Sequence, residues 1–160
     1  MNPTGTVVVG ADGSPESRAA IEFAMREATR RHAWLKVVAA VKLPEYWTIA
    51  YGTADLPSPE EVIADAKRAT RQTLDDVVRD RPELATVPFN IEAIAGPPGP
   101  VLVEAADGAD QLVLGHRGRG AVRSALLGSV GLHCVLHATC PVTIVRPATV
   151  TEPAHAAAQA

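Results

Sequence analysis

Four residues in the C-terminal half of the chain have types and a spacing that suit the binding of phosphate. Gly115 and Gly118 are separated by two residues, and the pair Gly128-Ser129 follows after nine more. Glycine takes up positive φ and lets a backbone approach an anion closely, and the amides at the start of a helix favour negative charge. The spacing therefore predicts a loop that holds a polyanion. Glycines at a turn can also have a purely steric purpose, and spacing alone does not decide between the two.

The same loop carries a local excess of cations. Arg117, Arg119 and Arg123 lie within it, and no acidic residue occurs between positions 115 and 138, although the whole chain has a formal net charge of −3. This contrast is typical of a small anion site, whereas a nucleic-acid-binding face would be broader, so we expect no nucleic-acid partner. The loop has neither the Gly-Lys-Ser/Thr of a Walker A sequence nor the glycine spacing of the dinucleotide fingerprint.

The glycine pattern resembles the signature of a known family. Gly-x2-Gly-x9-Gly-Ser is the ATP-binding signature of the universal stress protein family, and every fixed position of it is present. Residues 7–14, Val-Val-Val-Gly-Ala-Asp-Gly-Ser, and residues 140–147, Cys-Pro-Val-Thr-Ile-Val-Arg-Pro, are also similar to that family. The resemblance covers about residues 5–147. It implies a regulatory or stress-response protein that binds ATP, with Mg²⁺ assisting.

Length and composition are those of one folded domain. A chain of 160 residues can bury most of its apolar surface, and a hydrophobic content of 47% argues against a disordered protein. No apolar run approaches the length of a membrane span, and the first residues lack the regions of a signal peptide. We therefore expect a cytoplasmic protein without a membrane partner, with one domain over 1–147 and a disordered Ala-rich tail over 148–160.

Strand and helix patterns alternate along the chain. Helices are expected from Pro15 and from Pro59, each after a capping serine, and over 96–106 and 129–138. The apolar stripe of the first helix is Ala20, Ile21, Ala24, Met25 and Ala28, and that of the second is Val62, Ala66, Ala69, Thr73 and Val77. Strands are expected at 6–10, 34–41, 88–94, 111–114 and 142–146. Three of the six aromatic residues fall in the loop 42–57, which serves either as a ligand contact or as a flap over the sheet edge.

This alternation predicts an α/β fold, a doubly wound five-stranded parallel sheet with helices on both faces. The resemblance implies the strand order 3-2-1-4-5. Ligands of such sheets bind beyond the carboxyl ends of the strands, where the winding reverses. With that order, the reversal lies between the first and fourth strands, so the loops after Gly10 and Leu114 meet at one crevice.

The resemblance assigns nucleotide-binding residues around this crevice. It implies that the backbone of Val41 meets the adenine edge, that the glycines let the loop wrap the ribose and phosphates, and that the helix start at Ser129 holds the outer phosphates. Arg117 and Arg119 either screen phosphate charge or are solvated loop residues without a ligand contact. The complete set is Gly10, Ala11, Asp12, Val41, Gly115, Arg117, Gly118, Arg119, Gly128, Ser129 and Val130.

Asp12 has two interpretations. Just past the first strand, its carboxylate could accept hydrogen bonds from ribose hydroxyls and could coordinate a Mg²⁺ ion that bridges phosphates. It could also form an Asx turn or a helix cap beside Gly13. We expect no metal held by the protein alone, since His133, His137 and the two cysteines, expected to be buried reduced thiols, lack a familiar ligand spacing.

We expect no catalytic residues. Hydrolysis needs a group that orients water and usually a metal clamp, and the loop contains neither an acid nor a placed base. A slow ATPase, an adenylyl-transfer enzyme and a cyclic AMP sensor that uses the same pocket remain alternatives.

The sequence of the last strand predicts that the protein associates with a second copy of itself. Its β-branched run would leave unpaired backbone groups at the sheet edge, and pairing with the same strand of a second copy satisfies them through a two-fold contact. The family resemblance implies the same arrangement. We therefore expect a homodimer through Val142, Thr143, Ile144 and Val145.

Overall fold

The computed structural model describes residues 3–43, 56–118 and 127–147 of the chain. The aromatic residues of the long loop, the arginines at 119 and 123, and the tail after 147 lie outside the described residues. The expectations for those segments therefore stay predictions.

Five parallel strands form one sheet in the order β3-β2-β1-β4-β5, as expected. The strands are β1 (Thr6–Gly10), β2 (Trp34–Val41), β3 (Phe89–Ala95), β4 (Gln111–Gly115) and β5 (Val142–Val145). The winding reverses between β1 and β4, which are direct neighbours in the sheet.

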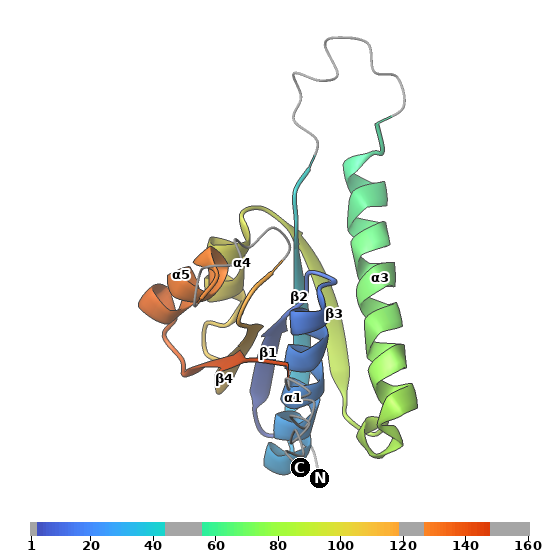
Figure 1. The fold of residues 1–160 in the computed structure, drawn as a ribbon, viewed down its shortest axis with the longest axis vertical. Coiled ribbons are helices and arrows are strands. Elements are labelled where there is room, and N and C mark those ends of the chain that lie inside the picture. The colour runs from blue at the N-terminus through green and yellow to red at the C-terminus, as the bar shows by residue number, and fades with distance from the viewer. Residues whose placement is uncertain (1–2, 44–55, 119–126, 148–160) are drawn as a thin grey trace, which may run out of the picture.

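Helices cover both faces of the sheet, which confirms a doubly wound α/β fold (Figure 1). They are α1 (Pro15–Arg31), α3 (Pro59–Asp80), α4 (Pro98–Ala105) and α5 (Ser129–His137), with a short 3-10 turn η1 (Pro82–Leu84) after α3. α1 and α3 pack on one face, and α4 and α5 pack on the other. No described helix combines the length and the apolar character needed to cross a membrane.

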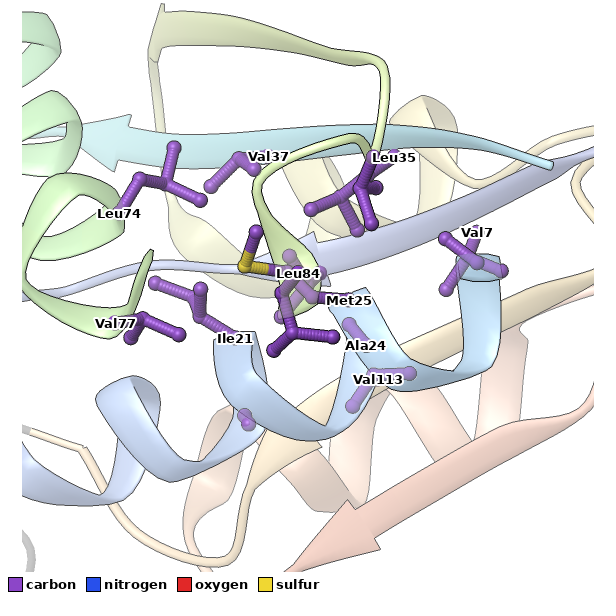
Figure 2. Packing of buried hydrophobic residues seen from close by; sticks show 14 of the residues in the cluster. Val7, Ile21, Ala24, Met25, Leu35, Val37, Leu74, Val77, Leu84 and Val113 are labelled. Atoms are coloured by element: carbon purple, nitrogen blue, oxygen red, sulfur yellow. The ribbon is translucent and has the colours of Figure 1, made fainter. Parts of the chain in front are cut away.

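The larger core lies between the sheet and helices α1 and α3. Figure 2 shows Ile21 and Met25 of α1 packed against side chains of the central strands. Val7, Val8 and Val9 of β1 are fully buried because β1 has a neighbour on each side and helices on both faces. Successive residues of a strand point to opposite faces, so Val7 and Val9 join this core while Val8 joins the smaller core under α4 and α5.

Both predicted helix starts are present. Ser14 caps α1, and its hydroxyl accepts a hydrogen bond from the amide of Ser17 at 3.1 Å, with Pro15 at the first helical position. Ser58 and Glu61 form a reciprocal capping box at the start of α3. These contacts satisfy amides that have no partner within the helix.

The apolar stripe of α1 is confirmed, whereas that of α3 is shifted. The five predicted α1 residues are all buried. In α3 the buried residues are Thr70, Leu74 and Val77, which confirms Val77 of the predicted stripe. Ala69 is exposed, so its predicted burial is wrong, and Val62, Ala66 and Thr73 are half-buried. Leu74 reaches the core that α1 shares, while the residues of the first half of α3 are exposed or half-buried.

Some strand boundaries differ from the expected ones by one residue. β4 includes Gly115, because Gly115 pairs with Val145 of β5, and β5 ends there rather than at Arg146. β3 runs through Ala95, which pairs with Val41. It is an edge strand, as its alternating pattern predicted.

Candidate functional site

A large cleft opens beyond the carboxyl ends of β1, β2 and β4, where the winding of the sheet reverses. Its volume is about 1410 Å³. The ends of β1, β2 and β4, the turn into α4 and the start of α5 contribute to its lining. Clefts at this position in doubly wound sheets are the usual ligand sites.

The residues chosen from the sequence meet at this cleft. Those that line it are Gly10, Ala11, Asp12, Val41, Gly115, Arg117, Gly118, Gly128, Ser129 and Val130. Arg119, the remaining member of the set, lies outside the described residues. Chain segments far apart in the sequence are thus brought together as one lining.

Asp12 takes up the structural role that was its alternative interpretation. Its Oδ1 accepts hydrogen bonds from the amide and the hydroxyl of Ser14, at 2.9 and 2.6 Å. Its own amide donates to the hydroxyl of Ser17 at 3.4 Å. These contacts hold the carboxylate at the start of α1, on the wall of the cleft. Asp12 is exposed and lines the cleft, so its structural role does not remove it from the surface that a ligand would meet.

Gly118 lies directly against this carboxylate. A Cβ atom built on Gly118 would be 2.5 Å from Oδ2 of Asp12, which is too close for any side chain unless the carboxylate moves. The absence of a side chain at 118 therefore keeps the β4 loop and Asp12 together.

Gly115 has a different reason to be glycine. A Cβ atom there would lie 2.8 Å from the backbone carbonyl carbon of Glu16, in the first turn of α1. Backbone cannot yield as a flexible side chain does, so Gly115 lets α1 pack closely against the end of β4. Residue 115 must therefore be glycine for a structural reason, whereas the family resemblance implied that this glycine contacts the ligand.

The start of α5 is held against the β4 loop. The amide of Gly128 donates to the carbonyl of His116 at 2.9 Å, and no side chain caps the helix. Ser129 and Val130, the first residues of α5, line the cleft, so the positive end of the helix dipole faces it.

None of the signature glycines that the structure describes has positive φ. Gly128 has φ −68, and a Cβ atom built on it would make only ordinary contacts. The described glycines with positive φ are Gly13, Gly96 and Gly108, outside the signature. Close packing rather than left-handed backbone accounts for Gly115 and Gly118.

At the end of β2, the backbone amide and carbonyl of Ala40 point toward the side of β1, whereas those of Val41 point toward β3. The carbonyl of Val41 accepts from the amide of Gly96 at 3.0 Å, on the side of β3. Alternate residues of a parallel strand point their amide and carbonyl to opposite neighbours. The carbonyl of Val38 accepts from Ala11 on the side of β1, so the backbone groups of Ala40 also point to that side, beyond the end of β1.

Several cleft residues were missed by the sequence interpretation. They are Ala40 and Lys42 on the β2 side, Ser17 on α1, and Gly96, Pro97 and Pro98 at the turn into α4. The Gly-Pro-Pro turn directly follows the carboxyl end of a strand. Residues at that position lie at the crevice of a doubly wound sheet, so the sequence could have been used to predict that this turn lines it. Ala40 could not be found in this way, because its orientation depends on the register between strands.

The two cysteines lie away from the cleft, and Cys140 is only half-buried, contrary to the expectation of two buried thiols. Burial first, and then the charge of Cys140, raises the pKa of the Cys134 thiol to about 11. Burial also raises the pKa of Cys140. Both thiols are therefore protonated at neutral pH. The described residues hold no group of three or more potential metal ligands.

Comparison with known proteins places the chain in a family. The sequence model of the universal stress protein family matches residues 3–146. A universal stress protein of Mycobacterium tuberculosis strain H37Rv is 34% identical over 164 residues, which cover 94% of this chain and 51% of the relative. Another universal stress protein, of Mycobacterium bovis, is 33% identical and is also covered over 51% of its length. The chain thus spans about half the length of these curated relatives.

Solved structures agree with the fold. The crystal structure of a universal stress protein in complex with cAMP has a TM-score of 0.61 and 27% sequence identity, and the match covers 88% of this chain and 95% of the other. An Arabidopsis thaliana protein of the family, with AMP bound, has a TM-score of 0.57 at 20% identity, covering 95% of this chain and 98% of the other. On the match of the family model over nearly all of its length, the chain belongs to the universal stress protein family.

Proposed function

We propose that the protein binds an adenine nucleotide, ATP in the first place, in the cleft between β1 and β4, and acts as a stress-response or regulatory protein. The observation that carries the proposal is the convergence on one cleft of the described residues that the family resemblance had selected. The relative solved in complex with cAMP, at 27% identity, supports an adenine nucleotide as the ligand class.

The shape and charge of the cleft suit a base at one end and phosphates at the other. The backbone amide and carbonyl of Ala40 offer one donor and one acceptor side by side, which is the pattern needed to pair with the edge of adenine. The start of α5, with its amides and its dipole, suits the phosphates. Asp12 follows β1, which lies between β2 and β4 in the sheet, and suits the ribose.

Magnesium is proposed as a companion of the phosphates rather than as a resident ion. Mg²⁺ is commonly held by one or two carboxylates together with substrate phosphates. Asp12 is the one acidic residue in the described lining of the cleft, and its Oδ2 is directed to the loop that carries Gly118. A single carboxylate fits an ion that arrives with ATP.

We further propose that the protein does not turn ATP over. Among the described residues that line the cleft, Asp12 is the only carboxylate, and its Oδ1 is engaged by Ser14. A cyclic AMP sensor would use the same cleft with fewer phosphate contacts, and it is the second candidate because the 27% identical relative was solved with cAMP. Slow hydrolysis or adenylyl transfer would need additional groups. The cytoplasmic location stays a prediction.

A homodimer through β5 is the proposed assembly. β5 is an edge strand, and its four residues are half-buried in the single chain. Beside it, α5 exposes Leu132, Val135 and Leu136. The sequence from Gly128 to Val145 has no aspartate, glutamate, lysine or arginine, and a depletion of charge is typical of the centre of an interface.

Calorimetric titration of the protein with ATP, ADP, AMP and cyclic AMP, each with and without Mg²⁺, tests the ligand. We expect saturable binding of ATP, strengthened by Mg²⁺. The variant Gly128→Glu should fold, since an acid is favourable at a helix start, and should lose ATP binding through charge repulsion and bulk. A wild-type protein that binds none of the four nucleotides would refute the proposed function.

A further inference from the structure

Arg117 carries a buried polar atom that the fold leaves without a partner. Its Nε is buried and makes no hydrogen bond, although the residue lines the cleft. A buried N–H group of a cation without an acceptor costs free energy, because it has lost water and gained nothing in return. The fold keeps this group in place at a cost, which an anionic ligand would offset.

The backbone of Arg117 lies against the start of α5. A Cβ atom built on Gly128 would lie 3.6 Å from the Cα of Arg117, and the amide of Gly128 bonds to the carbonyl of His116 just before it. The backbone of Arg117 is thus packed against the first residue before α5. Arg117 and the first residues of α5, whose start has no side-chain cap, therefore line the cleft as neighbours.

The charge around the cleft also favours an anion. Among the described lining residues, Arg117 and Lys42 are cations and Asp12 is the acid, in a chain whose net charge is −3. None of the ion pairs between described residues includes Arg117, whereas most arginines of α1 and α3 are paired with acids on the same or a neighbouring element. Arg117 is therefore available to a ligand.

From these observations we infer that Arg117 sets the selectivity of the cleft for the phosphate chain, so that nucleotides with two or three phosphates bind more tightly than AMP, cyclic AMP or adenosine. This inference rests on the proposed function. Guanidinium presents a planar fork of N–H donors that matches phosphate oxygens, and it stays charged at all accessible pH values. Arg117 belongs to the loop after β4 and Ala40 to β2, so different segments of the chain contact the phosphates and the base.

The test is a set of calorimetric titrations of wild type, Arg117→Gln and Arg117→Lys with ATP, ADP, AMP, cyclic AMP and adenosine. Arg117→Gln should weaken ATP binding about tenfold or more and leave adenosine binding almost unchanged, so the ratio of ATP to adenosine affinity collapses. Arg117→Lys keeps the charge but not the planar fork, so its ratio of ATP to adenosine affinity should lie between those of wild type and Arg117→Gln. Lys67→Gln, on the exposed surface of α3, is the charge-matched control and should bind every ligand as wild type does.

The melting temperature without ligand gives an independent readout. Because Nε has no partner in the fold, Arg117→Gln should melt at or above the wild-type temperature. An arginine with a structural purpose would lower the melting temperature when replaced, and that result would overturn the inference. If Arg117→Gln does not fold, Arg117→Lys takes its place in the titrations, and a ratio of ATP to adenosine affinity equal to that of wild type would overturn the inference.

The outcomes separate this inference from the function on which it rests. If wild type binds no adenine ligand, the proposed function fails. If wild type binds ATP and Arg117→Gln has the same ratio of ATP to adenosine affinity, only the assignment of Arg117 fails.

Discussion

The Oδ2 atom of Asp12 occupies the space that a side chain at Gly118 would need, since a Cβ atom on Gly118 would lie 2.5 Å from it. Gly118 comes from the loop after β4 and Asp12 from the loop after β1, far apart in the sequence. The contact joins the two loops at the point where the winding of the sheet reverses. We therefore expect a single methyl group added at residue 118 to disturb the contact between the two loops.

Gly118→Ala should weaken ATP binding about tenfold or more and leave the fold intact. The added methyl would push aside the carboxylate of Asp12, which is exposed and belongs to neither core cluster. The displacement would remove a proposed ribose or magnesium ligand from its position. Calorimetric titration with ATP measures the loss.

Gly128→Ala is the matched control for this change. Its added methyl would lie 3.5 Å from the carbonyl oxygen of His116, an ordinary contact, so this variant should bind ATP nearly as wild type does. Equal binding by Gly118→Ala and wild type would contradict the assigned role of the Gly118–Asp12 contact.

Gly115→Ala should destabilise the fold. Its methyl would meet the backbone of Glu16 at 2.8 Å, and a strained contact of this kind costs about 1–3 kcal/mol. Urea denaturation of Gly115→Ala and Gly118→Ala, side by side, measures the difference in the free energy of unfolding. We expect the loss for Gly115→Ala to be clearly larger, and a Gly115→Ala protein as stable as wild type would show that α1 can shift away.

Much of the fold could be predicted from the sequence, because local signals agree with the final structure. The buried run Val7-Val8-Val9 marks a central parallel strand, and Ser14-Pro15 and Ser58-Pro59 mark helix starts at the residues observed. The strand order came from the family resemblance, since no local pattern specifies which strands pair. The stripe of α3 was misplaced because helical periodicity alone does not decide between Thr73 and Leu74.

The candidate site could be predicted in outline but not in detail. The residue types at 12, 115, 118 and 128 pointed to a crevice between two loops, and they meet there. The orientation of Ala40 and the purpose of Gly115 depend on strand register and on the approach of α1, which are tertiary relationships. Glycine spacing therefore marked the right loop, while the physical reason for each glycine required the structure.

Ile144→Lys should weaken self-association more than nucleotide binding. Ile144 lies in the middle of the edge strand β5, and a lysine there places an uncompensated charge at the proposed two-fold contact. Light scattering at micromolar concentration should give about twice the 16.8 kDa mass of one chain for wild type and a mass closer to one chain for the variant. A wild-type mass near that of a single chain would refute the dimer.

Alkaline pH should destabilise the protein partly through Cys134. Burial raises the pKa of this thiol from its ordinary value of 9.0 to about 11. Between those values the unfolded chain releases the proton while the folded protein keeps it, so the free energy of unfolding falls as the pH rises from 9 to 11. Below that window the contribution of the thiol to stability is fully present.

Urea unfolding of wild type and Cys134→Ala, each at several pH values across this window, isolates the effect. Cys134→Ala should be less stable than wild type at neutral pH because it lacks the buried sulfur. As the pH rises, however, its free energy of unfolding should fall less than that of wild type. Parallel curves for the two proteins would mean that Cys134 does not contribute to the pH dependence.

Thermal melting with and without millimolar ATP and Mg²⁺ tests whether the folded protein binds the nucleotide, because a ligand that binds only the folded state raises its stability. A site with micromolar affinity adds about 4 kcal/mol at a thousandfold excess of ATP over the dissociation constant. For a domain of this size, that corresponds to a rise in melting temperature of roughly 8–16 °C. We expect such a rise for wild type and a much smaller one for Gly118→Ala. A wild-type melting temperature that does not change with ATP would refute nucleotide binding in the cleft.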